Sequence, residues 1–359
     1  MKYALIGCGR ISPNHVAAAV KNNLEIVAVC DIVPEHMENI LSKFDINNSN
    51  IKRYTDYKEM IEIEDLDLVA IATESGKHAG IAVDCINKGI NVIIEKPIAL
   101  SLADADRIIE AAKRNGVVVC ANHQNRFNKS IQKIRQAMEH GDFGKLMYGT
   151  AHIRWNRGQD YYTQATWRGT WEQDGGALMN QCIHNIDLLR WMMGDEVDEV
   201  CAYTDNLNHE YIQAEDLGMA LVKFKNGSYG IIEGTTDIYP KNLEETLYIF
   251  GKQGTVKAGG KSVNIIEEWN FAGNTEDAET VKKENSEMPE SVYGFGHTPL
   301  YKNVINAINT NTQPLIDAEA GKRALELVLA IYKSAAEHRP VKLPLDNCST
   351  MDFIGRLDK

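Results

Sequence analysis

Disulfide chemistry has little support in this sequence. None of the seven cysteines forms a Cys-x-x-Cys pair, and an odd number of cysteines cannot all pair within one chain. Several cysteines lie in apolar runs, where cysteine usually acts as a small hydrophobic side chain. We therefore expect a reduced, cytoplasmic protein.

Long apolar runs and an excess of positive charge are also absent. No run approaches the roughly 18 residues that a membrane helix needs, and Met1 and Lys2 lead straight into a strand-like pattern without a signal peptide. The formal net charge of -12 disfavours non-specific attraction to nucleic acid or to anionic membranes. We expect neither as a partner.

The composition that remains is that of an ordinary globular protein, with 44% apolar and 25% charged residues. A single core stops growing efficiently at roughly 250 residues. The 359 residues therefore predict two domains.

The first 120 residues alternate short β-branched runs with segments of helical spacing, as parallel strands joined by crossover helices do. Ser101 and Gly116 are a typical cap and stop for one of the helices. The expected strands are 2–7, 25–31, 66–73, 91–95 and 117–121, and the expected helices include 34–44, 78–88 and 101–115.

After about residue 123 the pattern changes to a helix, a polar and aromatic stretch, another helix and then longer strands. Asn226-Gly227 lies between 217–225 and 228–236, which is a strong hairpin signal and predicts an antiparallel sheet. The charged and poorly periodic stretch 272–290 predicts a surface loop. Closing helices are expected near 299–311 and 317–337, before an extended segment at 341–345.

A dinucleotide-binding turn is indicated directly after the first expected strand. The motif runs Gly7-Cys8-Gly9-Arg10-Ile11-Ser12 and opens a helix. Glycines let the backbone approach a pyrophosphate, and a helix N-terminus supplies amide donors. Alone, the two glycines also fit a simple tight turn.

Asp31 ends the second expected strand, 22 residues after Gly9. A carboxylate there accepts hydrogen bonds from an adenine ribose diol and repels a 2′-phosphate, which favours NAD over NADP. The alternative is a strand-end or helix-capping carboxylate. The combination with the glycines favours the cofactor interpretation, so NAD is the expected cofactor.

Two further motifs resemble those of a known family. Ala72-Thr73-Glu74-Ser75-Gly76-Lys77-His78 and Glu95-Lys96-Pro97, which ends the fifth strand of a dinucleotide domain, are similar to the glucose-fructose oxidoreductase and inositol dehydrogenase family, Gfo/Idh/MocA. Glu74 stands where that family usually has Pro. The resemblance runs through nearly the whole chain, including Val341-Lys342-Leu343-Pro344.

This resemblance implies an α/β protein with two domains. An N-terminal Rossmann domain is expected at 1–122, and a C-terminal α+β domain with a large open, mainly antiparallel sheet at 123–359, which binds substrate and mediates dimers or tetramers. The resemblance implies that Lys96 reaches the nicotinamide and the substrate hydroxyl, whereas an isolated lysine would be interpreted as a surface residue. It also implies that the Lys96-Pro97 bond is frequently cis. The expected cofactor-binding residues are Gly7, Gly9, Arg10, Ile11, Asp31, Thr73, Ser75, His78, Glu95, Lys96 and Gln124.

A buried helix is expected across 175–194, with glycines at both ends and apolar residues around most of its circumference. Asn180, His184 and Asp187 recur at i, i+4 and i+7 and share one face, where polar groups need partners or a ligand. A lone buried His is usually a satisfied core residue. The family, however, places a His at position 184 and commonly an Asp at position 180, both lining the substrate pocket. Asp187 is expected to be structural.

These side chains fit the oxidation of a secondary alcohol, in which a base takes the hydroxyl proton while the carbon gives a hydride to the nicotinamide. An imidazole titrating near neutrality suits that task, so His184 is the expected base and Lys96 the group that stabilises the alkoxide. The reverse assignment stays open, and Asn180 completes the expected catalytic set. No His-x-x-x-His pair or Cys/His cluster with ligand spacing occurs, so no metal is expected.

The stretch 154–176 is rich in aromatic residues and arginines. Aromatic faces stack on bases or sugars, and arginine forks match carboxylate or phosphate oxygens. The alternative is a loop packed on its own aromatics at a subunit contact. The expected substrate-binding residues are Arg154, Arg157, Tyr161, Tyr162, Trp167, Arg168, Asn180 and His184.

With 179–184, 233–236 and 296–299, this stretch resembles the 3-dehydrogenases that act on UDP-N-acetylglucosaminuronate in cell-surface polysaccharide biosynthesis. The resemblance implies a 3-keto sugar nucleotide as product, and some members regenerate bound NAD with 2-oxoglutarate. The alternatives are the same oxidation of UDP-N-acetylglucosamine, an inositol or free-sugar dehydrogenase, and a regulator that senses NAD or a sugar. A sensor has no need of both Lys96 and His184.

Overall fold

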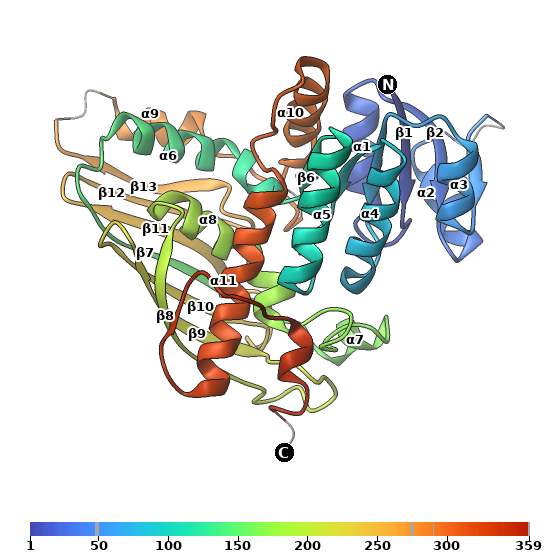
Figure 1. Cartoon of the computed structure of the whole chain (residues 1–359). Helices are drawn as coiled ribbons and strands as arrows, with labels where there is room; N and C mark the ends of the chain where they lie inside the picture. Colours follow the sequence, from blue (N-terminus) through green and yellow to red (C-terminus); the bar gives the residue numbers. More distant parts are fainter. Residues whose placement is uncertain (47–49, 274–275, 290, 358–359) are drawn as a thin grey trace. The chain divides into compact units, whose positions relative to one another are not determined.

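The computed structural model describes residues 1–46, 50–273, 276–289 and 291–357 (Figure 1). The chain forms two compact units, Met1–His123 with His297–Lys322, and Gln124–Gly296 with Arg323–Lys359. The segment 297–322 thus packs with the N-terminal part, although it follows the second unit's sheet in sequence. The boundary between the predicted NAD-binding and substrate-binding domains, at residues 122 and 123, stays a prediction.

The first unit contains a parallel sheet of six strands in the order β3-β2-β1-β4-β5-β6, so the expected Rossmann sheet is confirmed. From Tyr3 onward β1 is buried, and β4 is buried throughout, as strands covered on both faces are. The strands are β1 (Lys2–Ile6), β2 (Glu25–Cys30), β3 (Lys52–Tyr54), β4 (Leu68–Ile71), β5 (Asn91–Ile94) and β6 (Val119–Ala121).

Helices connect these strands, and their punctuation follows the sequence signals. The Ser101 side chain accepts a hydrogen bond from the Asp104 N–H at the start of α5, and Gly116 ends the helix with φ +65°. The strand order reverses between β1 and β4, which is where nucleotides bind in such sheets. The helices are α1 (Ser12–Lys21), α2 (Pro34–Lys43), α3 (Tyr57–Ile63), η1 (Ser75–Lys77), α4 (His78–Asn87), α5 (Leu102–Asn115) and α10 (His297–Thr310).

The second unit contains a mainly antiparallel sheet of eight strands in the order β13-β12-β11-β7-β10-β9-β8-β14, with β7 and β10 parallel. The hairpin expected at Asn226-Gly227 joins β9 to β10, and Gly227 has φ +85°. The strands are β7 (Leu146–Arg154), β8 (Val197–Asp205), β9 (Leu217–Phe224), β10 (Tyr229–Thr235), β11 (Glu244–Gly251), β12 (Gly254–Gly259), β13 (Ile265–Phe271) and β14 (Val341–Lys342).

On one face of this sheet, the helix α8 and the turn η3 that precedes it approach the strands closely (Figure 1). A Cβ on Gly234 would lie 2.6 Å from the Cys182 sulfur, and a Cβ on Gly149 would lie 2.9 Å from both Leu189 and Met193. Glycines on the strands thus make room for the helix. The unit's helices are η2 (Gln124–Phe127), α6 (Lys129–His140), α7 (Gln159–Thr163), η3 (Leu178–Cys182), α8 (Ile183–Met193), α9 (Ala278–Glu284), η4 (Thr350–Phe353) and, from Arg323 onward, α11 (Ala318–Glu337).

Two sequence expectations need correction. The helix expected at 175–194 begins with a π-helical turn, η3, before α8, and this turn packs against glycines of the sheet. The loop expected at 272–290 contains the helix α9, whose start is capped by Asp277 accepting the Thr280 N–H. The short helix has too few turns to show periodicity in sequence. Residues 274, 275 and 290 of that stretch lie outside the described residues.

Candidate active site

The turn after β1 has the geometry of a dinucleotide-binding loop. Gly7 has φ +92°, and a Cβ there would lie 2.5 Å from the backbone carbonyl of Ala72, which follows β4. Only glycine fits that position. At Gly9, by contrast, no described heavy atom lies within 4 Å of the place a Cβ would take, so the backbone there is open.

Asp31 is fixed beside this turn. Its Oδ2 accepts the Cys8 N–H at 2.8 Å, and its Oδ1 accepts the Val33 N–H at 2.8 Å. These bonds satisfy the strand-end interpretation of Asp31. A carboxylate offers about four acceptor positions, so it also has capacity for a ribose diol.

The N-terminus of α1 completes a site that fits the pyrophosphate of NAD. Pro13 lies in its first turn, and among the described residues no side chain caps its first amides. Ser12 is buried, and its hydroxyl donates to the Gly9 carbonyl at 2.6 Å, so it serves as the third small residue of the motif. Uncapped amides at a helix N-terminus bind phosphate oxygens.

Lys96 follows β5 and is only partly buried, whereas its neighbours Glu95 and Pro97 are buried. The Lys96-Pro97 bond is cis. The buried His78 ring lies 2.8 Å from the Pro97 carbonyl through Nδ1 and 3.2 Å from the Thr73 carbonyl through Nε2. His78 thus links the turns that follow β4 and β5, and burial lowers the pKa of its imidazole.

Glu95 is the centre of a buried network. Its Oε1 accepts from His15 Nε2 at 3.0 Å and from the Asn122 side chain, and its Oε2 accepts the Lys96 N–H at 3.1 Å. Burial alone would raise the pKa of the Glu95 carboxyl, but hydrogen bonds from His15 and His297 hold this pKa well below its usual range. Glu95 therefore carries a fixed negative charge one residue before Lys96.

The network continues from His15 Nδ1 to the Tyr301 hydroxyl at 2.7 Å, and from there to the Tyr3 hydroxyl at 3.0 Å. His15, Glu95 and His297 also offer ligand atoms within 4.8 Å of one another. Sequence spacing could not show this group, because its members are 80 and 202 residues apart. The His15–Glu95 hydrogen bond and a contact of 3.2 Å between Asn122 Nδ2 and His297 Nε2 hold these side chains together.

The other expected cofactor residues are placed as follows. Arg10 is exposed, Ile11 and Thr73 are half-buried, and Ser75 is buried at 5% exposure. Gln124 belongs to η2 in the second unit, where it is buried and donates to Asn125 at 3.4 Å.

In the second unit, Asn180 and His184 stand out by their access to solvent. Across 177–193, a range the structure describes completely, every residue except these two is buried. Asn180 lies in the π-helical turn η3, and His184 lies in the first turn of α8. π-Helical turns are frequent at functional sites. The two polar side chains thus mark one accessible position on an otherwise buried helix.

Asp187 behaves differently from these two residues. It is fully buried, and its carboxylate accepts from Arg126 Nε at 2.7 Å and Nη2 at 2.6 Å, and from Arg190 at 3.2 Å. Arg126 comes from η2, so this ion pair fixes α8 to another helix. The structural role expected for Asp187 agrees with this arrangement.

Arg154 lies at the end of β7 between two carboxylates. It donates to Glu233 through Nε at 2.8 Å and through Nη2 at 2.5 Å, and it also donates to Glu244. Its charge is thus balanced within the protein. These ion pairs raise the pKa of Arg154 further above its usual value.

Arg157 and Arg168 surround one aromatic ring. The guanidinium carbon of Arg168 lies 4.1 Å from the Tyr161 ring centroid, and that of Arg157 lies 5.4 Å from it. Trp167 is half-buried and 5.5 Å from Arg168, so the four side chains form one aromatic and cationic cluster. Tyr162 is buried instead, and its hydroxyl bonds to Thr236 at 3.2 Å.

Two buried carboxyl groups were not anticipated from the sequence. Burial raises the pKa of Glu215 to about 8, although its Oε1 accepts from the Leu178 N–H at 2.8 Å and the Tyr332 hydroxyl at 2.9 Å. Burial likewise raises the pKa of Glu245 to about 8, and Arg157 opposes this effect. Isolated acidic residues in strand-rich segments give no sequence signal for such burial.

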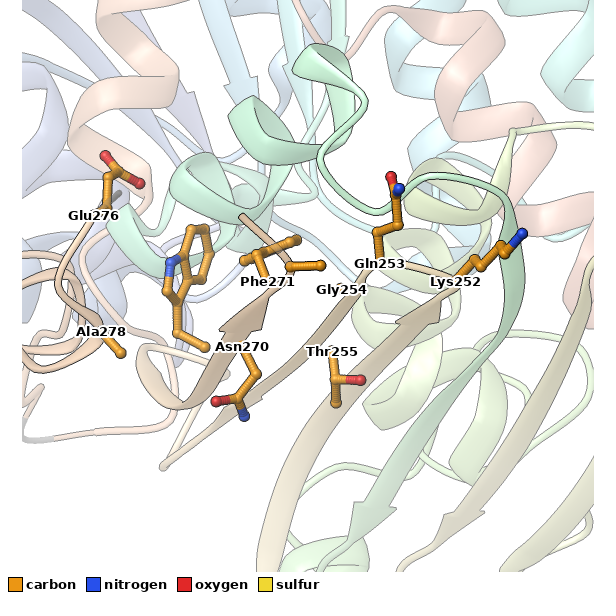
Figure 2. Close-up of a pocket in the computed structure, with 11 residues that line it drawn as sticks. Lys252, Gln253, Gly254, Thr255, Asn270, Phe271, Glu276 and Ala278 are labelled. Carbon is orange, nitrogen blue, oxygen red and sulfur yellow. The ribbon is translucent and has the colours of Figure 1, made fainter. Parts of the chain in front are cut away.

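The second unit also has two surface depressions away from these residues. One, of about 430 Å³, is lined by the turn and strands at Lys252–Thr255 and Asn270–Ala272, with Glu276 at its rim (Figure 2). The other, of about 670 Å³, lies on the open face of the sheet around Tyr148, Leu221 and Tyr229. None of the expected site residues lines either depression.

Within the described ranges, no helix combines the length and the apolar character needed to cross a lipid bilayer.

Comparison with known proteins gives matches over nearly the whole chain. The WlbA dehydrogenase from Bordetella pertussis, crystallised with NADH and UDP-GlcNAcA, is 38% identical with a TM-score of 0.88 and covers 96% of this chain and 98% of its own. WlbA from Chromobacterium violaceum, crystallised with the same two molecules, is 36% identical with a TM-score of 0.87 and covers 96% of both chains.

Myo-inositol 2-dehydrogenase from Thermotoga maritima is 28% identical over an alignment of 363 positions, which covers 96% of this chain and 98% of that protein. Two models of one oxidoreductase family match the chain. The model of the NAD-binding Rossmann fold matches residues 1–123, and the model of the C-terminal alpha/beta domain matches residues 135–343. The chain therefore belongs to the Gfo/Idh/MocA oxidoreductase family, and NAD is its cofactor.

Proposed function

We propose that this protein oxidises the 3-hydroxyl of a UDP-sugar, with UDP-N-acetylglucosaminuronate as the substrate and its 3-keto form as the product. The observation that carries the proposal is the similarity to two WlbA dehydrogenases crystallised with that compound, at 36% and 38% identity over 96% of this chain. The place of such a reaction is the synthesis of cell-surface polysaccharide.

The side chains of the second unit support an anionic sugar nucleotide. Arg157 and Arg168 lie around Tyr161, so a cationic and aromatic surface is available for a uracil ring, a diphosphate or a carboxylate. Arg154 is less suited to this role, because Glu233 and Glu244 already neutralise it.

In the proposed chemistry, NAD supplies the hydride acceptor when it is bound. Gly7 and the N-terminus of α1 hold its pyrophosphate, and Asp31 holds its adenine ribose. His184 takes the proton from the substrate hydroxyl at its imidazole, and the Lys96 ammonium stabilises the alkoxide that develops. Asn180 orients the sugar from the neighbouring turn.

Glu95 supports Lys96 without touching the substrate. Its carboxylate accepts the Lys96 N–H and is enclosed by His15 and Asn122. Glu95 is therefore a positioning residue for the backbone that carries the catalytic ammonium.

The proposal is tested with purified protein, NAD and UDP-N-acetylglucosaminuronate, with and without 2-oxoglutarate as an acceptor for regenerating NAD. We expect formation of the 3-keto sugar nucleotide, detected by mass spectrometry. UDP-N-acetylglucosamine and myo-inositol serve as competitors. Faster turnover of UDP-N-acetylglucosamine would reassign the substrate, and turnover of no sugar nucleotide would contradict the proposal.

The second candidate is an inositol dehydrogenase. It is favoured by the 28% identity with the Thermotoga maritima myo-inositol 2-dehydrogenase over 96% of this chain. The same assay decides between them, because a preference for myo-inositol over every UDP-sugar supports this second candidate.

A further inference from the structure

The accessible amide of η3 is held by a buried carboxylate. Asn180 Nδ2 donates to Asp174 Oδ1, and Asp174 Oδ2 accepts the Gly169 N–H at 2.8 Å. Asp174 is 2% exposed, while Asn180 keeps partial access to solvent. The contact therefore joins a buried charge to a side chain that a ligand can reach.

The backbone that carries this contact has little freedom. Gly169 has φ +68°, and a Cβ on it would lie 2.6 Å from Ile212, so the N–H that bonds Asp174 is fixed by close packing. Gly176, two residues after Asp174, would place a Cβ 2.5 Å from the Glu215 carbonyl oxygen. Asp174 is thus held from both sides.

The hydrogen bond to Asp174 also fixes the orientation of the Asn180 amide group. An ionised carboxylate only accepts hydrogen bonds, so the NH₂ group of Asn180 must face Asp174 and its carbonyl Oδ1 must point away. A carbonyl oxygen accepts hydrogen bonds and carries no net charge. Residue 180 therefore offers a neutral acceptor on the side away from Asp174.

The charge of Asp174 affects Tyr161 in the neighbouring aromatic and cationic cluster. The pKa of the Tyr161 hydroxyl is raised, mainly by burial and further by the negative charge of Asp174. The positive charges of Arg168 and Arg157 oppose this rise in pKa. Tyr161 also accepts a hydrogen bond from Gln181 at 3.1 Å, next to Asn180. Asp174 thus contacts η3 and also acts on Tyr161, one of the residues proposed to bind the sugar nucleotide.

We infer that Asp174 is a positioning residue that makes Asn180 a neutral hydrogen-bond acceptor for a hydroxyl or amide N–H of the substrate. The inference rests on the proposed function. A carboxylate at position 180 would meet an anionic substrate with repulsion, whereas the amide does not. The pair thereby keeps the negative charge one side chain away from the substrate.

Three variants test the pair, with the wild type assayed first. Asp174→Asn leaves the amide free to face either way, so kcat should fall by roughly tenfold. Asn180→Asp brings two carboxylates together, which should lower kcat by about 100-fold. The double variant D174N/N180D restores one carboxylate and one amide with their places exchanged.

The double variant separates positioning from stability. With UDP-N-acetylglucosaminuronate as the substrate, we expect it to recover kcat to within about fivefold of wild type and to show a KM raised by about tenfold through charge repulsion. The NAD dissociation constant, which Asp31 and Gly7 determine in the first unit, should not change in any variant. Melting temperatures are measured for all four proteins.

Three results would overturn the inference. The first is a D174N variant with the kcat and KM of the wild type. The second is a double variant whose kcat is no higher than that of N180D. The third is a double variant whose melting temperature returns to that of the wild type, while its kcat stays low and its KM is not raised. If the wild type oxidises myo-inositol and no sugar nucleotide, the proposed function fails separately. The same variants are then compared on myo-inositol, where the loss in D174N and its recovery in the double variant still decide whether Asp174 positions Asn180.

Discussion

At the scale of single residues, Lys96 and His184 share one property, which is that each keeps access to solvent among buried neighbours. Glu95 on one side of Lys96 is held by an internal network, and the residues around His184 belong to the core of the second unit. Reactive groups on a rigid, buried support are typical of active sites, because their positions are fixed before the substrate binds.

The first prediction concerns these two residues. Lys96→Ala and His184→Ala should each lower the rate of hydride transfer by about 10²- to 10⁴-fold, because each removes a group that handles charge or protons. Lys88→Ala and His140→Ala, at exposed positions, are the controls. Single-turnover formation of NADH is the measurement, and circular dichroism checks folding. A near-normal rate in either active-site variant removes that residue from the mechanism.

A second prediction at this scale follows from the buried Glu245. Its pKa is raised to about 8 by burial, above the usual value of 4.5, so the folded state holds its proton more tightly than the unfolded state. Its contribution to stability is complete below pH 4.5 and is lost as the pH rises towards 8. The wild type should therefore lose roughly 2 to 4 kcal/mol from this group between pH 5 and 8.

Glu245→Gln removes that dependence, because the amide has no charge to bury. The melting temperature of the variant should exceed that of the wild type by a margin that grows as the pH rises. The exposed Glu210→Gln is the matched control and should follow the wild type. A margin that is constant or shrinks with pH would show that Glu245 is ionised in the folded protein.

At the scale of elements, the central feature is the close fit of η3 and α8 on the sheet. A Cβ on Gly218 would lie 2.4 Å from Leu178, and one on Gly234 would lie 2.6 Å from Cys182, so neither strand position has room for a further carbon. The elements that carry Asn180 and His184 are therefore positioned by the absence of side chains on the strands below.

The third prediction tests this fit. Gly234→Ala would place a Cβ 2.6 Å from the Cys182 sulfur, and overpacking of this kind costs about 1 to 3 kcal/mol. It should also lower kcat, because η3 must shift. Gly158→Ala is the control, since no described atom lies within 4 Å of its Cβ and its φ is -76°. Equal melting temperatures and rates in the two variants would contradict the argument.

The helices and strands show which features could be predicted from the sequence. Periodicity and the Asn226-Gly227 turn predicted both sheets, and the Gly7 motif, Asp31 and Lys96 mark the ends of strands, where local sequence is most informative. The π-helical turn was not predictable from local sequence, and it packs against glycines from strands that are distant in the sequence. The contacts of Asp174 and Glu95 depend on tertiary packing in the same way.

At the scale of the whole molecule, the outer face of the second sheet is unusually apolar. Met219, Leu221, Tyr229 and Ile231 are exposed on adjacent strands, and Leu221 pairs with Ile231 in register. A contiguous exposed apolar patch of this kind marks an interaction site. We propose that a second copy of the chain covers it, as in a dimer or tetramer.

The fourth prediction is that the wild type is a homo-oligomer and that Leu221→Glu dissociates it. Burying a charge without a partner at an apolar interface is unfavourable, so the variant should elute as a smaller species in size-exclusion chromatography with light scattering. Ile354→Glu, at an exposed position outside the sheet, should leave the assembly intact. A wild type that is monomeric at high concentration would contradict the proposal.

The proposed function requires hydride transfer from one carbon of a sugar nucleotide to NAD. The most direct measurement is a single-turnover reaction of the purified protein with NAD and UDP-N-acetylglucosaminuronate that carries deuterium at C3. We expect the deuterium to appear in the reduced coenzyme, with a slower transfer than from the unlabelled compound. Reduced coenzyme without deuterium, or no reduction at all, would contradict it.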